Sequence, residues 1–285
     1  MGVDAIFSWK PDSTDESGEY GTKYKATDRF TKLILNNIAV LPAELKTSNL
    51  VFNNNKNMSD KFMGSVFSIT DSLFKANGHV IDYKDKEKKF EKVFKRTVIK
   101  DPNRRIFDIY DDPLDLLNQF DGYLVQIKAA LDSTAHAVNP LLGTNFPGWK
   151  SKEINGSRLS GVYILNDLKN KKEPELDALI KYLDNATKDV SYLVNLRNKP
   201  VHFGGNSSLR GFFFSKSDKE ITNPIISHPD GNKENIREFI NESFENIIVF
   251  VSRVILYSIQ YKAPKGINIE QFINQRGDTE FRWRF

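Results

Sequence analysis

Three long apolar stripes in the second half of the chain constrain its fold more than any other feature of the sequence. They lie between Pro113 and Leu142, between Pro174 and Leu193, and between Glu234 and Tyr261. Apolar residues recur there at steps of three and four, which places them on one face of an α-helix. Three such helices predict a mainly α protein with an up-and-down helical bundle. The stripes are Leu117, Phe120, Leu124, Ile127, Leu131, Ala135 and Val138; then Leu176, Leu179, Leu183, Ala186, Val190 and Leu193; and then Ile236, Ile240, Phe244, Ile247, Val251 and Val254.

The first hundred residues predict a smaller helical region behind a flexible leader. Residues 1–26 are polar and rich in Gly, Asp, Ser and Thr, as loose segments are. Residues 27–100 predict one helix over Arg29–Leu41 and a second that begins at Ser59. We expect the second helix to end near Ala76, because Asn77 and Gly78 are the residue types that favour a helix C-terminus.

The boundary between the two halves is predicted at Asp101-Pro102-Asn103. Residues 101–285 are then a single helical bundle domain. Between its last two helices, the aromatic segment Leu209–Phe214 and the partly alternating segment Glu220–Ile226 predict a short β-hairpin insertion.

A dense run of charge covers Asp85–Lys100. Phe90, Val93 and Phe94 are spaced three and four apart within it, so the run predicts an amphipathic helix. Its charged side is either a solvated surface or a face that binds RNA.

Composition excludes several classes of protein. The chain has no cysteine, which excludes disulfides and cysteine-ligated zinc. The start lacks the pattern of a secretory signal, and the longest apolar stretch, Ile247–Ser258, is shorter than the roughly 20 residues that span a bilayer. We therefore expect a cytoplasmic protein. The formal net charge of +4 permits contact with RNA without requiring it.

The residues after the second stripe carry the clearest chemical signal. Four positions beyond Leu193 is Arg197, which predicts an arginine on the apolar face of the helix. An arginine there is costly unless it is paired or faces a functional cleft. Pro200 should end or kink the helix, which allows His202 to fold back toward Arg197.

Arg197-Asn198-Lys199-Pro200-Val201-His202 resembles the signature of the HEPN family of helical domains, an arginine followed by a polar residue and a histidine four to six residues further on. The resemblance covers roughly residues 112–262. It implies a HEPN-like bundle that cleaves RNA without a metal or other cofactor, usually as a homodimer that brings two copies of the motif to one cleft. Such ribonucleases include toxins and defence effectors.

The implied chemistry suits these side chains. A neutral His202 can accept the proton of a ribose 2′-hydroxyl, which then attacks the adjacent phosphate. Arg197 can hold that phosphate with two hydrogen bonds, while Asn198 and Lys199 add a hydrogen-bonding group and local positive charge. Because DNA lacks the 2′-hydroxyl, we expect neither DNA cleavage nor a DNA partner.

Other interpretations of the motif remain open. Arg197 can cap carbonyl groups at a helix end, and His202 can be an ordinary loop histidine. The protein would then be a helical scaffold, or a non-catalytic module of the HEPN type that binds RNA, nucleotides or another protein.

Supporting residues are expected on the first long helix of the bundle. Family members often place a polar residue of that helix in the cleft, and Asp132 or Ser133 is our choice. Asp132 and His136 are spaced i, i+4, so a surface ion pair between them is the alternative. The remaining histidines, His79 and His228, are expected in separate loops, and no metal-binding spacing occurs.

Overall fold

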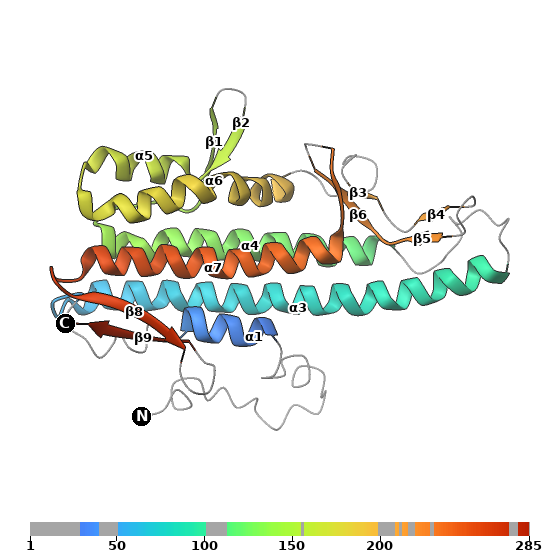
Figure 1. Cartoon of the computed structure of the whole chain (residues 1–285), viewed down its shortest axis with the longest axis horizontal. Helices are drawn as coiled ribbons and strands as arrows, with labels where there is room; N and C mark the ends of the chain where they lie inside the picture. The colour runs from blue at the N-terminus through green and yellow to red at the C-terminus, as the bar shows by residue number, and fades with distance from the viewer. Residues whose placement is uncertain are drawn as a thin grey trace, which may run out of the picture.

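The computed structural model describes residues 29–39, 51–100, 113–154, 157–198, 209–210, 213–215, 220–228, 231–273 and 279–284. The protein is mainly helical, as the sequence predicts. The described residues form four long helices, which are α3 (Lys56–Lys100), α4 (Pro113–Leu142), α6 (Asp177–Asn198) and α7 (Ile236–Lys262). Their axes lie roughly along one direction, and successive long helices run in opposite senses (Figure 1).

The three predicted stripes form the centre of the hydrophobic core. Every predicted stripe residue is buried except Ala186, which is half-buried and packs against the core. Figure 1 shows α4 and α7 as a middle layer, with α6 on one side and α3 on the other. An aromatic chain crosses these layers, because Phe120 of α4 contacts Phe239 of α7, and Phe239 contacts Tyr192 of α6, at ring-centroid distances of 6.1 and 6.0 Å.

The helix expected to end at Asn77 and Gly78 instead continues to Lys100, so that prediction is wrong. Asn77 is fully buried, and its side-chain amide donates a hydrogen bond to the hydroxyl of Thr31 at 3.3 Å. The hydrogen bond to Thr31 and the burial of Asn77 therefore outweigh the local preference of asparagine for a helix end. The charged run Asp85–Lys100 belongs to the same helix.

The N-terminal elements share the core of the bundle. The predicted first helix is present as α1 (Arg29–Ile34), followed directly by η2, a short π-helix (Leu35–Ala39). Phe30 stacks at a tilt on Phe244 of α7, with ring centroids 4.8 Å apart, and Arg29 forms an ion pair with Glu245. The predicted leader and the predicted boundary at residues 101–103 lie outside the described residues.

The remaining elements are short. A helix, α5 (Val162–Lys171), and a turn of 3-10 helix, η4 (Pro174–Leu176), precede α6. The expected insertion contains strands β3 (Leu209–Arg210), β4 (Phe213–Ser215), β5 (Glu220–Thr222), β6 (Ile225–Ser227) and β7 (Lys233–Asn235), paired antiparallel as β4-β5 and β3-β6-β7. Two further antiparallel hairpins were not anticipated: β1 (Ser151–Ile154) with β2 (Ser157–Ser160), and β8 (Asn268–Ile273) with β9 (Thr279–Arg284).

Candidate functional site at the end of the bundle

Arg197 lies in the last turn of α6, at the end of the bundle where α7 begins (Figure 1). The sequence predicts it on the buried face of α6, but its side chain is exposed. The buried stripe continues from Leu193 to Leu196, three positions on, with Leu196 only 3% exposed. Because a helical turn takes 3.6 residues, either position can continue a stripe, and here the leucine does so. The arginine is therefore reachable from solvent.

The other motif residues cannot be placed relative to Arg197. Asn198 is the last residue of α6. Lys199 and His202 lie outside the described residues, so their expected approach to Arg197 stays a prediction.

A histidine and a carboxylate that the sequence does not connect meet at this end of the bundle. His228 follows β6, and its Nε2 lies 3.0 Å from a carboxylate oxygen of Glu234 in β7. Gly231 provides the turn between them, with a φ of +87° that favours glycine. The His228 ring also contacts Tyr192 of α6 and Phe239 of α7, at centroid distances of 5.3 and 5.9 Å.

These contacts assign His228 to holding the hairpin against α6 and α7. Tyr192, its partner on α6, precedes Arg197 by five residues, and five residues correspond to about 140° around a helix. His228 therefore packs on a different side of α6 from Arg197. The sequence Pro-Asp-Gly, which favours a turn, stands between His228 and Glu234 and is the signal from which their pairing could have been predicted.

Asp132 binds the loop that follows α4. Its Oδ1 accepts a hydrogen bond from the backbone amide of Trp149 at 2.5 Å, and Lys128 donates to both of its oxygens at 2.6 Å. Gly148 lies against it with a φ of +129°, and a Cβ there would be 2.7 Å from Oδ1. The expected ion pair with His136 is not formed. His136 is exposed, and Asp132 forms its ion pair with Lys128 instead.

Glu87 is a buried carboxyl group that the sequence does not reveal. Its side chain is fully buried in α3, and its carboxylate lies 3.4 Å from the guanidinium of Arg237 in the first turn of α7. Burial raises the pKa of this carboxyl, and Arg237 opposes that rise. Neither carboxylate oxygen, nor the buried hydroxyl of Tyr83 one turn earlier, makes a hydrogen bond with a described residue.

His79, expected in a loop, lies inside α3 instead. Its Nδ1 is 2.9 Å from the side-chain oxygen of Gln119 in α4. Gly122 of α4 leaves room for the ring, since a Cβ there would be 2.4 Å from His79 Cε1. His79 therefore joins α3 to α4 and is separate from His228 and Arg197.

Two features are absent from the described residues, a metal site and a membrane-spanning helix. These residues contain no group of three His, Cys, Asp or Glu side chains placed to bind a metal ion. None of the described helices is long and apolar enough to cross a membrane. No family model, curated protein or solved structure matches the chain. The HEPN resemblance therefore rests on residues 197–202 and on the helical pattern around them.

Proposed function

We propose that the chain is a metal-independent endoribonuclease of the HEPN type, of the kind that acts as a toxin or defence effector. The observation that supports this proposal best is the exposure of Arg197 at the end of a buried helix. A guanidinium in that position can reach a phosphate of a bound RNA, whereas a scaffold role would bury it against a carboxylate. The backbone of α6 is held in place up to that point by the buried side chains of Leu193, Val194 and Leu196.

In the proposed reaction, His202 removes the proton from a ribose 2′-hydroxyl, and the resulting oxyanion attacks the adjacent phosphorus. The bond from phosphorus to the 5′-oxygen of the next nucleotide breaks, and that oxygen takes up a proton. The products are a 2′,3′-cyclic phosphate and a free 5′-hydroxyl. Arg197 offsets the negative charge that grows on the phosphate oxygens. Asn198 and Lys199 assist in binding the phosphate.

Asp132 is left out of the proposed site. Its two oxygens are used by Lys128 and by the amide of Trp149, which makes it a support for the loop after α4. We propose a homodimer as the active form, so that light scattering should give twice the chain mass of 32.7 kDa.

The test is incubation of the purified protein with a mixed RNA pool in EDTA. Wild type should cleave the RNA, leave 2′,3′-cyclic phosphate ends and spare DNA of the same sequence. Arg197→Ala and His202→Ala should each lower the rate by at least about a hundredfold. The matched controls are Arg253→Ala and His136→Ala, which remove an exposed arginine from α7 and an exposed histidine from α4; both should cleave like wild type.

Equal loss of activity in Arg197→Ala and Arg253→Ala would refute the assignment of Arg197. If folded wild type leaves every RNA intact, the ribonuclease proposal fails. Binding of RNA or a nucleotide by wild type that Arg197→Ala weakens would then identify the second candidate function, a non-catalytic binding module. That module needs the same exposed arginine.

A further inference from the structure

The second half of α3 leaves the core of the bundle. Tyr83 and Glu87 are the last of its described side chains to be buried, and none of those described after Glu87 is fully buried. In Figure 1 the helix continues past the ends of α4 and α7. This projecting segment is continuous with a helix of 45 residues, so packing of the first half fixes its direction.

One side of this segment is positively charged. Its exposed cations are Lys88, Lys89, Lys92, Lys95 and Arg96, which together we term the cationic face of α3. At 100° per residue they fall within an arc of about 120°. Phe90 points to the opposite side, where it packs against the core. Lys95 also pairs with Glu91, whereas none of the ion pairs between described residues involves Lys88, Lys92 or Arg96.

The composition of the cationic face favours a nucleic acid over a protein or a membrane. Protein interfaces are depleted of lysine and enriched in aromatic residues at their centres, and this arc holds four lysines and no aromatic residue. A helix that lies in a membrane surface needs an apolar side for the lipid, but Phe90 on that side packs against the protein's own core. Lysine and arginine are the residues that contact phosphates.

We propose that the cationic face of α3 binds the phosphate backbone of single-stranded RNA. Lys88 and Arg96 are about 12 Å apart along the helix axis, which is the length of roughly three or four stacked nucleotides at the 3.4 Å rise of a B-form strand. This inference rests on the proposed function for its choice of RNA, because RNA is the substrate of the proposed nuclease.

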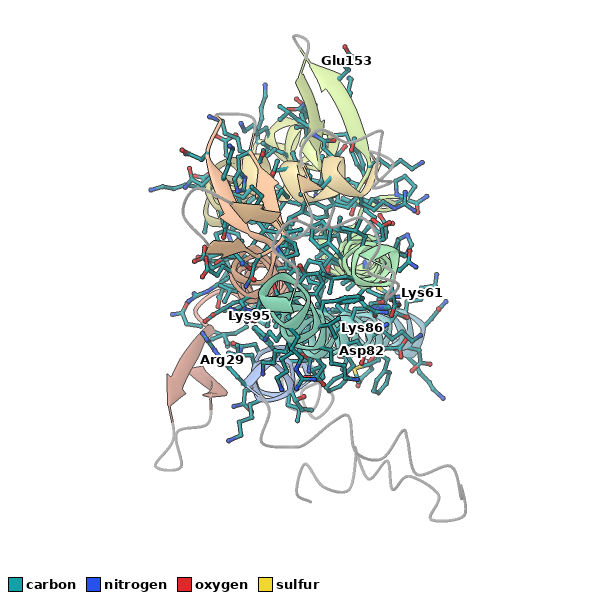
Figure 2. The ribbon with its side chains drawn as sticks, turned by 90° about the vertical axis from the view of Figure 1, so that its right-hand side faces the viewer. Arg29, Lys61, Asp82, Lys86, Lys95 and Glu153 are labelled. Atoms are coloured by element: carbon teal, nitrogen blue, oxygen red, sulfur yellow. The ribbon has the colours of Figure 1, made fainter. Side chains whose placement is uncertain are left out.

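The C-terminal ends of α3 and α6 point in the same direction along the bundle, and α3 reaches further (Figure 1). Figure 2 looks onto the end of the molecule toward which both helices run, with Lys86 and Lys95 labelled on α3. Binding is by charge and is independent of base sequence.

Binding is measured by fluorescence anisotropy with a labelled 20-nucleotide 2′-O-methyl RNA, which keeps the phosphates and lacks the free 2′-hydroxyl that cleavage requires. The test variant is Lys88→Gln/Lys92→Gln/Arg96→Gln. The matched control is Lys56→Gln/Lys61→Gln/Lys75→Gln, which removes the same charge from exposed positions in the first half of α3. Glutamine has nearly the helix propensity of lysine and arginine, so both triple variants should fold, and circular dichroism checks this.

We expect the test variant to bind about ten- to fiftyfold more weakly at 0.15 M salt, with the slope of log K against log salt reduced by about 2. The control should bind like wild type. Equal weakening of both variants, no weakening of either, or no binding by wild type would overturn the inference, as would equally tight binding of polyglutamate. The three single substitutions give the same test if the triple variant does not fold.

Cleavage of unmodified RNA separates this inference from the proposed function. Face-dependent binding without Arg197-dependent cleavage would keep the binding surface and reject the nuclease. Cleavage that is unchanged in the test variant, together with unchanged binding, would keep the nuclease and reject the surface.

Discussion

Replacing Gly122 with alanine adds a methyl group where α4 faces His79 of α3. The new Cβ would lie 2.4 Å from His79 Cε1, 2.6 Å from Nε2 and 2.7 Å from Nδ1. Atoms of this kind need well over 3 Å, so the ring must move. Its Nδ1 is 2.9 Å from the side-chain oxygen of Gln119, and that hydrogen bond is lost when the ring moves.

The net effect on the free energy of unfolding follows from three contributions. Overpacking costs about 1 to 3 kcal/mol. Loss of the His79–Gln119 hydrogen bond costs about 0.5 to 1.5 kcal/mol. The higher helix propensity of alanine returns about 1 kcal/mol. Gly122→Ala should therefore destabilise the protein by roughly 0.5 to 3.5 kcal/mol.

The control is the same substitution in open space. Gly64 is an exposed residue of α3, and no heavy atom would lie within 4 Å of a Cβ there. Gly64→Ala should stabilise the protein by about 0.5 to 1 kcal/mol, since only the helix propensity changes. The assay is urea unfolding followed by circular dichroism, with all variants fitted for midpoint and slope.

A double-mutant cycle with His79→Ala identifies the cause. Without the imidazole, Gly122→Ala has no ring to displace, and its effect should become neutral or stabilising. The reasoning is refuted if Gly122→Ala stabilises the wild-type protein as Gly64→Ala does, or if its cost is unchanged in the His79→Ala background.

Two further predictions concern the carboxyl groups of Asp132 and Glu87. Asp132→Ala should cost about 1.5 to 3 kcal/mol, because the amide of Trp149 loses a charged acceptor, and hydrogen exchange should show faster opening of the loop after α4 than in a His136→Ala control. Burial raises the pKa of Glu87 above its ordinary 4.5, so the wild type should lose stability relative to Glu87→Gln as the pH rises through 4.5 and then through the folded-state pKa. Unfolding curves at pH 4 and pH 7 measure this difference; an equal difference at both values would contradict it.

Helix periodicity predicted the bundle because the stripes report burial directly. Leu117, Phe120 and Leu124 follow one face of α4 regardless of what surrounds it, and the same holds for α6 and α7. Helix periodicity gave the wrong prediction at the end of α6, where two neighbouring residues both continue the stripe. Leu196 and Arg197 both fit a 3.6-residue period, and the sequence alone does not determine which one is buried.

Local preferences were a poorer guide where partners are distant in sequence. Asn77 favours a helix end by itself, but its hydrogen bond to Thr31 from another helix makes it a core residue of α3. Asp132 appeared suited to a cleft, yet its partner is a backbone amide in a loop 17 residues away. Glu87 is buried through contact with α7, a pairing that periodicity does not reveal.

The length of α3 sets how far its charged end extends from the bundle, and the number of its residues sets the direction in which that end faces. The helix is about 67 Å long, and each residue adds 1.5 Å of length and 100° of rotation. Removing seven residues from the projecting part would shorten it by about 10 Å and turn the remaining segment by only about 20°. Removing two would shorten it by about 3 Å and turn it to nearly the opposite side. Small insertions and deletions in this one helix can therefore change the direction of its charge independently of its reach, with the core of the bundle unchanged.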